Sequence, residues 1–228
     1  MKNKAIILLS GGLDSVVSMA KAMEENDVEL ALFFDYGQKA FDRELKSSSE
    51  IAKFYNIDHK TIKLDWLKDI STSSLNTKEN IPQLSKNDLD NEEITKQSAN
   101  AVWVPNRNAL FINIAAAIAE ANNFSKIILG ANIEEGATFK DNTLEFINSV
   151  NNTLKYSVNT DIKVIAPLIN KNKTEIVEEG IKLNVPFELI FSCYHNSEKH
   201  CGLCESCLRL KRALELNNRH DIIKKLFG

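Results

Sequence analysis

The sequence predicts an α/β fold with a doubly wound parallel sheet, and two observations support this expectation. First, short apolar runs alternate with segments of helical spacing along most of the 228 residues. Strands that alternate with helices form a parallel sheet with helices on both faces. Second, the first apolar run ends in a Ser-Gly-Gly turn that leads directly into a helical segment. Such folds bind ligands at the carboxyl ends of their strands, so this turn marks the expected site.

Each expected element follows from its own pattern. Buried or alternating apolar runs predict strands, and apolar residues at helical spacing predict helices. Residues 68–100 are polar and weakly periodic, which predicts a solvated surface insertion, with a lid over the site as the alternative. The expected strands are 5–9, 29–35, 59–64, 126–129 and 161–166, and the expected helices are 16–25, 41–55, 106–122, 144–156, 173–183 and 204–216.

The composition argues against several classes of protein. Hydrophobic residues make up 43% and charged residues 26% of the chain, as in an ordinary globular protein. No apolar run approaches the ~18 residues of a membrane span, and the apolar run that follows Met1 is too short for a signal peptide. We therefore expect a cytoplasmic protein without a membrane partner. The formal net charge of −3 gives no indication of a nucleic-acid partner.

The turn after the first strand has the composition of a phosphate-binding loop. Glycines let backbone N–H groups approach an anion closely, and a helix N-terminus adds a favourable dipole. The loop lacks the Gly-Lys-Ser/Thr of a Walker A loop, and the bland alternative is a tight turn with a helix cap. Asp14 either orients Mg²⁺ or caps the first helix. We expect the contacts to a phosphate-bearing ligand to come from Leu8, Leu9, Ser10, Gly11, Gly12, Leu13, Asp14 and Ser15, with Ser10, Asp14 and Ser15 acting in catalysis.

The four cysteines lie close together near the end of the chain. Four protein ligands leave no open position on a metal, so a zinc ion bound there is expected to be structural. Free thiols, a redox pair and an iron–sulfur cluster are the alternatives. His195 and His200 are expected to be neighbours of the metal and not ligands. The spacing C-x7-C-x2-C-x2-C can supply a tetrahedral Zn²⁺ with four thiolates, from Cys193, Cys201, Cys204 and Cys207.

The hexapeptide SGGLDS, from Ser10 to Ser15, resembles the pyrophosphate-binding loop of the N-type ATP pyrophosphatases. This superfamily includes GMP synthetase, NAD synthetase and several tRNA-modifying enzymes. The resemblance implies an adenine nucleotide alpha hydrolase-like sheet and cleavage of ATP, with its Mg²⁺, between the α and β phosphates. The substrate becomes an adenylate, pyrophosphate leaves, and a nucleophile then displaces AMP.

A second resemblance covers nearly the whole chain. It is carried, in order, by FDYGQ at 34–38, VPNRN at 104–108, GAN at 130–132, PLINKNKTEIV at 167–177 and FSCYHNSEKHCGLCESCLRLKRAL at 191–214. These motifs are similar to those of the 7-cyano-7-deazaguanine synthase family. The resemblance implies an ATP-dependent ligase that forms a carbon–nitrogen bond. Its small-molecule substrates would be 7-carboxy-7-deazaguanine and ammonia, in the biosynthesis of queuosine and archaeosine precursors.

Residues at the end of the second strand and at the starts of two later helices are expected to complete the ATP site. Asp35 and Tyr36 end the second strand, where an adenosine would lie, unless Asp35 only caps the following turn. Arg107 begins a helix and can grip phosphate or carboxylate through two parallel hydrogen bonds, unless it is a surface arginine. Of Lys171 and Lys173, we assign Lys173 to neutralising the charge that develops on pyrophosphate, the alternative being a solvated lysine pair.

Residues 137–143 are where the chain departs from the family's pattern. The family's Ser-Gly-Tyr-Pro-Asp-Cys-Arg here reads Ala-Thr-Phe-Lys-Asp-Asn-Thr, so the aromatic residue and the Asp remain while the Cys and the Arg are lost. Phe139 is expected to stack on the purine-like ring and Asp141 to accept hydrogen bonds from its guanine-like edge, with Arg107 also binding substrate. The alternative is that 141–143 merely cap the following helix.

This departure keeps other functions open. One is transfer of sulfur to tRNA, although such enzymes often use a catalytic cysteine and the metal cluster claims all four. Another is attachment of a deazaguanine to a macromolecule. A non-catalytic zinc module that binds nucleic acid is disfavoured by the acidic charge and the phosphate loop. We expect an ATP-binding α/β domain over 1–185 and a zinc-binding helical lobe over 186–228, and a homodimer is left open.

Overall fold

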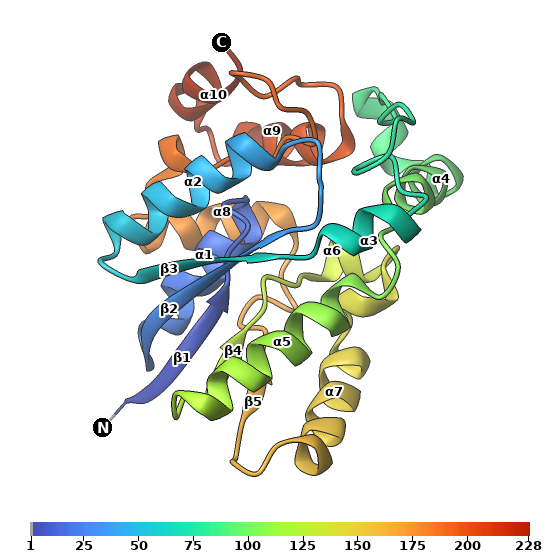
Figure 1. Ribbon diagram of the computed structural model, residues 1–228. Helices are drawn as coiled ribbons and strands as arrows, with labels where there is room; N and C mark the ends of the chain where they lie inside the picture. The colour runs from blue at the N-terminus through green and yellow to red at the C-terminus, as the bar shows by residue number, and fades with distance from the viewer. Residues whose placement is uncertain (1) are drawn as a thin grey trace.

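The computed structural model describes residues 2–228 and contains the parallel sheet that the sequence predicts (Figure 1). Within these residues the sheet has five strands in the order β3-β2-β1-β4-β5, and every neighbouring pair is parallel. The chain builds outward from β1 in one direction and then in the other, as in doubly wound folds. The strands are β1 (Asn3–Leu8), β2 (Asn26–Asp35), β3 (Asp58–Lys63), β4 (Lys126–Ile128) and β5 (Lys163–Ile165).

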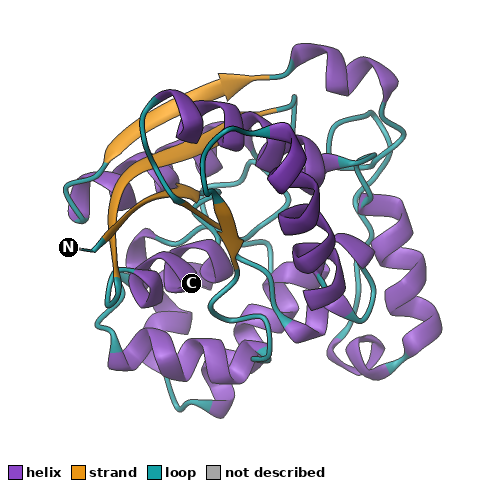
Figure 2. Ribbon diagram, turned by 90° about the horizontal axis from the view of Figure 1, so that it is seen from below, coloured by secondary structure: helices purple, strands orange, loops and turns teal. Residues whose placement is uncertain are grey.

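Helices connect the strands and pack around the twisted layer that they form (Figure 2). In the described part of the chain, no helix has the length and apolar character that crossing a membrane would require. The helices are α1 (Leu13–Ala22), α2 (Phe41–Phe54), α3 (Asp65–Ile70), α4 (Glu92–Val102), α5 (Arg107–Ala121), α6 (Ile133–Gly136), α7 (Leu144–Ser157), α8 (Lys173–Lys182), α9 (Glu205–Leu216) and α10 (His220–Phe227), with 3-10 turns η1 (Lys86–Asp90), η2 (Lys140–Asn142) and η3 (Phe187–Leu189).

The side chains of β1 alternate between two hydrophobic cores, because successive residues of a strand point to opposite faces of the sheet. Ala5 and Ile7 pack with α1, α2 and α8. Ile6 and Leu8 face the other way and pack with α5 and α7. The central strand is therefore buried on both sides, which is why it reads as a continuous apolar run in the sequence.

Residues 68–100 form the solvated surface insertion that their polarity predicts only in part, since exposed positions alternate with buried ones. The segment contains α3 and α4 in part, and it buries Ser73, Ser74 and Leu75 within the protein. The pattern also failed to reveal α10, and it started the second strand at 29 instead of Asn26. Hydrophobic periodicity is a weak signal here because the buried face of α4 consists of small or polar residues, namely Thr95, Ser98, Ala99 and Val102.

The first turn of α1 lies directly on the backbone that follows β4. A Cβ atom built on Gly130 would lie 2.7 Å from both N and Cα of Ser15 and 2.9 Å from the carbonyl carbon of Asp14. These are backbone atoms, so they cannot rotate away as a side chain could. Glycine at this position therefore allows the loop after β1 to approach the neighbouring strand closely.

Gly130→Ala is expected to lower the free energy of unfolding by about 1–3 kcal/mol, because the added methyl group forces backbone apart. Gly12→Ala is the matched control for stability. Gly12 has a φ of −76°, which alanine adopts, and its new Cβ would lie nearest the hydroxyls of Ser10 at 3.4 Å and Ser192 at 3.5 Å. Denaturant unfolding of both variants measures the difference, and equal stabilities would contradict the close approach.

Candidate active site

A cavity of about 220 Å³ opens at the carboxyl ends of β1, β2 and β4. Its wall is made by the loop after β1, the end of β2, the start of α2, the start of α5, the connection from α6 to α7 and the segment before α9. Doubly wound sheets bind ligands at this edge, where the strand order reverses. The sequence motifs that lay far apart in the chain thus meet around one space.

The loop from Ser10 to Ser15 is held in a fixed shape by the rest of the protein. Gly11 has a φ of +84°, a conformation that suits glycine and strains other residues. Its carbonyl accepts hydrogen bonds from the Ser47 hydroxyl at 3.1 Å and from the Phe191 N–H at 2.9 Å. Two later parts of the chain, α2 and the segment before α9, therefore fix the shape of this turn.

Hydroxyl groups and the start of α1 converge on the same point. The hydroxyls of Ser10 and Ser15 lie 3.2 Å apart. The Gly12 N–H donates to the Ser10 hydroxyl at 3.2 Å, and the Ser15 hydroxyl donates to the Gly12 carbonyl at 3.0 Å. No side chain caps α1 at Gly12 in the described structure. Hydroxyls, backbone N–H groups and the helix dipole together suit an anion at this position.

The residues expected to contact ATP do not all reach the cavity. The Leu13 side chain is 2% exposed and packs into the hydrophobic core. Asp35 accepts a hydrogen bond from the Gly37 N–H at 3.1 Å, so it caps the turn after β2. Asp35 is outside the set of described residues that line the cavity. Those that do line it are Leu8, Leu9, Ser10, Gly12, Asp14, Ser15 and Tyr36.

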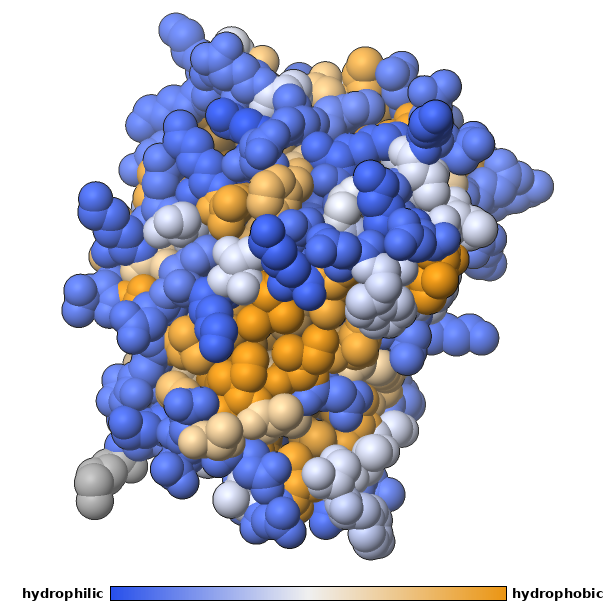
Figure 3. Space-filling model, in the orientation of Figure 1, coloured by the Kyte–Doolittle hydropathy of each residue, from blue (hydrophilic) through white to orange (hydrophobic). Residues whose placement is uncertain are grey.

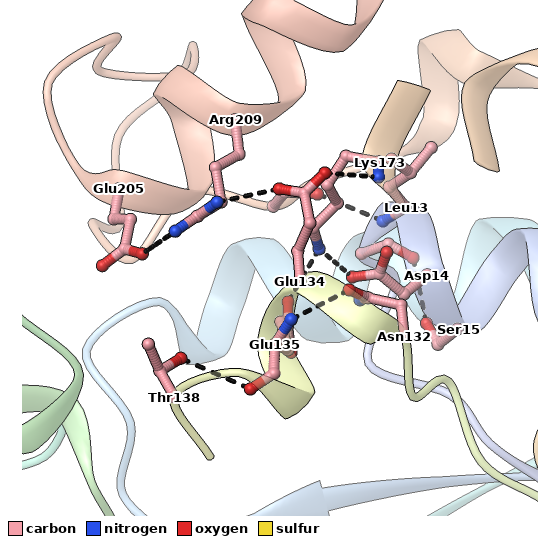
Figure 4. A network of polar contacts seen from close by, with 12 residues as sticks. Leu13, Asp14, Ser15, Asn132, Glu134, Glu135, Thr138, Lys173, Glu205 and Arg209 are labelled. Atoms are coloured by element: carbon pink, nitrogen blue, oxygen red, sulfur yellow. Dashed lines mark hydrogen bonds and ion pairs between the residues drawn. The ribbon is translucent and has the colours of Figure 1, made fainter. Parts of the chain in front are cut away.

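Lys173 is a buried cation that joins the loop to two other elements (Figure 4). Its side chain is 8% exposed, and its ammonium group bonds the Asp14 carboxylate and lies 2.7 Å from Oε1 of Glu135. Burial opposes the charge, but Asp14 and Glu135 outweigh it and raise the pKa of Lys173, which is therefore charged at neutral pH. Burial also raises the pKa of Asp14 to about 6, against the opposing effect of Lys173.

These contacts decide between the alternatives that the sequence left open for Asp14 and for the pair Lys171 and Lys173. Asp14 does not cap α1, because its carboxylate faces Lys173. Lys171 is the exposed member of the lysine pair and lies 3.8 Å from Glu179. Oδ1 of Asp14 is buried and has no hydrogen-bond partner among the described residues. An orphaned carboxylate oxygen beside a phosphate loop fits a divalent cation that accompanies a nucleotide.

The ion-pair network continues from Lys173 to the C-terminal helix α9. Glu134 accepts the Lys173 backbone N–H at 2.7 Å with one oxygen and Nη1 of Arg209 at 2.8 Å with the other. Arg209 also donates to Oε1 of Glu205 through Nε and Nη2, at 2.9 and 2.8 Å. Figure 4 shows these side chains in a row between α6 and α9. The network therefore links the phosphate loop to the cysteine-rich end of the chain.

Arg107 and Tyr36 meet at the cavity wall although 71 positions separate them. Nη1 of Arg107 donates to the Tyr36 hydroxyl at 3.4 Å, and the guanidinium lies 5.8 Å from the centre of the Tyr36 ring. Asn106 adopts a left-handed conformation, with φ 55°, just before α5 begins, so that Arg107 opens the helix at the cavity. Burial raises the pKa of Tyr36 to about 12, so the phenol is neutral. The guanidinium can bind an anionic group of a ligand beside the loop.

The segment that departs from the family's pattern forms another part of the wall. Phe139 lines the cavity and stacks on Trp103, with ring centres 6.2 Å apart and an angle of 12° between the planes. Thr143 caps α7 by accepting the Phe146 N–H at 3.1 Å. The capping alternative therefore belongs to Thr143 and not to Asp141. Asp141 is outside the set of described residues that line the cavity, although Phe139 and Asn142 on either side of it do line it. Burial raises the pKa of Asp141, and the charge of Arg107 opposes this.

Gln38 and Glu44 form a pair in the wall that sequence reasoning missed. The Gln38 amide oxygen accepts the Tyr36 N–H at 2.9 Å, and its Nε2 donates to the Phe34 carbonyl at 2.9 Å and to Oε2 of Glu44 at 3.0 Å. Burial raises the pKa of Glu44 to about 7. Gln38 belongs to the FDYGQ motif, which could have indicated its place in the site. Glu44 lies among other charged residues of α2, so no sequence pattern indicated it.

The four cysteines converge into one cluster, with their sulfur atoms all within 4.8 Å of one another. Sγ of Cys193 accepts the N–H groups of His195 and Cys201 at 3.4 and 3.5 Å. Sγ of Cys201 accepts those of Leu203 and Cys204 at 3.4 and 3.3 Å. Backbone donors of this kind favour the thiolate form, which is the form that binds a metal. The donor set fits a tetrahedral metal ion.

The two histidines near the cluster are not part of it in the described structure. Nε2 of His200 accepts the Ser192 N–H at 3.0 Å, so this nitrogen is already engaged. The Ser192 hydroxyl in turn accepts the Leu13 N–H of the phosphate loop at 3.1 Å. His200 therefore braces the segment that carries Cys193 against the loop.

Comparison with known proteins gives a consistent result across the chain. A family model described as "Queuosine biosynthesis protein QueC" matches residues 4–218. A protein of Methanosarcina mazei named 7-cyano-7-deazaguanine synthase is 46% identical over 216 residues, which cover 93% of this chain and 94% of that protein. Proteins of the same name from Methanosarcina barkeri and Pelotomaculum thermopropionicum are 45% and 47% identical. They cover 99% and 92% of this chain and 99% and 96% of their own lengths.

Lys173→Met is expected to destabilise the fold by about 3 kcal/mol, because two partly buried carboxylates lose the cation that they share. Lys171→Met is the matched control and should cost ~0–1 kcal/mol, since Lys171 is 36% exposed. Denaturant unfolding at pH 8 and pH 5 measures both. The deficit of Lys173→Met should shrink at pH 5, because burial already raises the pKa of Asp14 to about 6 and loss of the lysine raises it further, so that Asp14 takes up a proton and loses its unpaired charge. A deficit equal to that of the control, or one independent of pH, would contradict the buried pairs.

Proposed function

This chain belongs to the QueC family of queuosine biosynthesis proteins, and we propose that it converts 7-carboxy-7-deazaguanine and ammonia to 7-cyano-7-deazaguanine with ATP. One observation carries the proposal. A single cavity brings together a phosphate loop, a cation for an anionic substrate and an aromatic face for its ring, in Ser10–Ser15, Arg107 and Phe139. The three relatives named above are 7-cyano-7-deazaguanine synthases, and they match over nearly their full lengths.

The proposed chemistry begins with activation of the carboxylate. A carboxylate is a poor electrophile, and transfer of AMP to it creates an acyl group with a good leaving group. The hydroxyls of Ser10 and Ser15 and the N–H groups of the loop hold the phosphates. Ser10, Asp14 and Ser15 are assigned to catalysis. Lys173 is outside the set of described residues that line this cavity, and its ammonium group is paired with Asp14 and Glu135. We therefore assign it to offsetting, from behind Asp14, the negative charge that develops as pyrophosphate leaves. Arg107 orients the substrate carboxylate towards the α phosphate.

Ammonia then displaces AMP and forms the amide. A second ATP activates the amide oxygen, which departs with AMP as the nitrogen loses its protons and the nitrile forms. Both rounds use the same groups, because each requires an oxygen of the substrate at the α phosphate of ATP. The cavity must therefore release AMP and pyrophosphate between the rounds while it retains the amide.

Recognition of the deazaguanine is assigned to Phe139 and Asp141. The Phe139 ring, already stacked on Trp103, offers a face to a purine-like ring. The Asp141 carboxylate can accept hydrogen bonds from the amino and ring N–H groups of a guanine-like edge after a small movement of its turn. Tyr36 and Asp35 are assigned to the adenosine of ATP, with Asp35 acting through the turn that it caps.

We assign Mg²⁺ and Zn²⁺ to different sites. Mg²⁺ enters with ATP, and the orphaned Oδ1 of Asp14 supports its contact there. Zn²⁺ is assigned to Cys193, Cys201, Cys204 and Cys207, where four thiolates make the ion structural. We propose that 186–228 form the zinc-binding lobe and that 1–185 form the ATP-binding domain.

A homodimer in the cytoplasm is part of the proposal. Figure 3 shows a broad apolar area on the surface over α5. The hydrophobic side chains of α5 that are only partly buried include Leu110, Phe111, Ile114 and Ile118. An exposed apolar area of this kind suits contact with another chain. A second copy of this chain is the proposed occupant.

Two related functions receive less support. A tRNA thiolase of this superfamily would need a cysteine to carry sulfur, and the four cysteines of the sequence all lie in the cluster. An enzyme that attaches a deazaguanine to a macromolecule would share the phosphate loop, and the products of the reaction distinguish it.

The purified protein is expected to release AMP and pyrophosphate from ATP when 7-carboxy-7-deazaguanine and ammonium are present. Mass spectrometry should identify 7-cyano-7-deazaguanine, with two AMP formed for each nitrile because two oxygens must be activated. Gly12→Val should abolish turnover, since a side chain there blocks the close approach of backbone to phosphate. Formation of ADP and phosphate, or a product that lacks the nitrile, would overturn the proposal.

Elemental analysis is expected to find about one zinc ion for each chain. Cys204→Ser should lose zinc and lower the free energy of unfolding, because binding of a structural metal is coupled to folding. Glu198→Ala, at an exposed position between Cys193 and Cys201, is the control and should keep its zinc. Iron and sulfide in place of zinc would contradict the assignment and favour an iron–sulfur cluster.

A further inference from the structure

Glu44 is a carboxylate in the cavity wall without a cationic partner among the described residues. The other two carboxylates that line the cavity, Asp14 and Glu135, share Lys173. Glu44 is bound only through Oε2, by the neutral amide of Gln38 at 3.0 Å. The other two hydrogen bonds of the Gln38 side chain are made with backbone groups. A partly buried carboxylate in this state is expensive unless a ligand supplies the cation.

Glu44 lines the same cavity as the phosphate loop, Tyr36 and Arg107. Ser47, three residues further along the same face of α2, binds the Gly11 carbonyl of the phosphate loop at 3.1 Å. Besides burial, the charges of Arg107 and Cys193 act on the pKa of Glu44, Arg107 lowering it and Cys193 raising it. Glu44 thus shares one cavity with the loop assigned to the phosphates and with the guanidinium assigned to the substrate carboxylate.

We propose that Glu44 binds the ammonium ion and accepts a proton from it. The inference rests on the proposed function and adds a residue to it. One N–H bond of ammonium breaks, the proton moves to Oε1 of Glu44, and the nitrogen lone pair attacks the acyl carbon. The C–N bond forms as the bond from carbon to the AMP oxygen breaks, and AMP leaves with that electron pair. A second proton passes from nitrogen to solvent, which leaves the neutral amide.

The chemistry of the site favours ammonium over a divalent cation at this carboxylate. Mg²⁺ prefers phosphate oxygens together with one or two carboxylates and water, and the orphaned oxygen of Asp14 at the loop meets that need. Glu44 instead offers one oxygen, held in place by a neutral amide, which matches a single positive charge. Burial raises the pKa of Glu44 to about 7, and a base near the working pH is best suited to remove a proton.

Two partial reactions separate this role from the rest of the mechanism. Exchange of pyrophosphate with ATP, in the presence of 7-carboxy-7-deazaguanine and without ammonium, reports adenylation alone. Formation of the amide with ammonium reports the attack. Glu44→Gln keeps the shape of the side chain and an oxygen for Gln38, so it should retain exchange within about twofold. Its kcat/KM for ammonium should fall at least roughly 100-fold, the usual range for loss of a general base.

Hydroxylamine provides a second test, because it is largely unprotonated at neutral pH and needs no base to release it. The rate of Glu44→Gln with hydroxylamine should stay close to that of the unaltered protein. Glu44→Asp, which keeps a carboxylate, should recover part of the rate with ammonium. Glu50→Gln, an exposed position on the same helix, is the matched control and should change neither reaction.

Equal losses with ammonium and hydroxylamine, or unchanged kinetics with both, would overturn the role of Glu44. Loss of exchange that excess Mg²⁺ restores would overturn it in favour of a metal ligand. Absence of exchange in the unaltered protein would instead overturn the proposed function, and this inference with it. Thermal unfolding of Glu44→Gln should show a midpoint no lower than that of the unaltered protein, because a partly buried charge has been removed.

Discussion

The buried charge of Lys173 is the constraint on which the arrangement of this site depends. A lysine with 8% exposure keeps its proton only because Asp14 and Glu135 flank it. Removing one member of such a group leaves a charge in a poorly solvated place, so the three elements that supply them cannot drift apart. Lys173 begins α8, Asp14 lies in the first turn of α1 and Glu135 belongs to α6. One interaction thus aligns three helix starts at the carboxyl edge of the sheet.

The same network joins two parts of the chain that differ in chemistry. Glu134 binds both Lys173 and Arg209, and Arg209 binds Glu205, the residue after Cys204 of the cysteine cluster. On the other side of the loop, the Ser192 hydroxyl accepts the Leu13 N–H, and the Ser192 N–H is itself bound by His200. The segment that carries the cysteine cluster therefore braces the phosphate loop.

The cavity poses an electrostatic problem, because a site for ATP and a carboxylate substrate is itself lined by carboxylates. The problem is solved when every carboxylate of the cavity has a cation beside it. Within the protein, Lys173 forms ion pairs with both Asp14 and Glu135. On the proposal made here, Mg²⁺ completes Asp14 and ammonium completes Glu44, so the surplus negative charge becomes a means of gathering the cations that the reaction requires. The buried charges would then lower the stability of the fold but bind the cations that the reaction needs.

The sequence by itself determined the sheet, the phosphate loop and the metal cluster. Each of these depends on local signals: an apolar run, a Gly-Gly turn before a helix, and cysteines spaced for one ion. It did not reveal α4, whose buried face is small and polar, and it left the roles of Asp14, Lys171 and Lys173 open. Only the tertiary structure showed that Asp14 faces Lys173, that Thr143 caps α7 and that Glu44 stands without a cation in the wall. These features depend on which side chains meet across elements far apart in the chain, and burial decides their charge, so no local pattern records them.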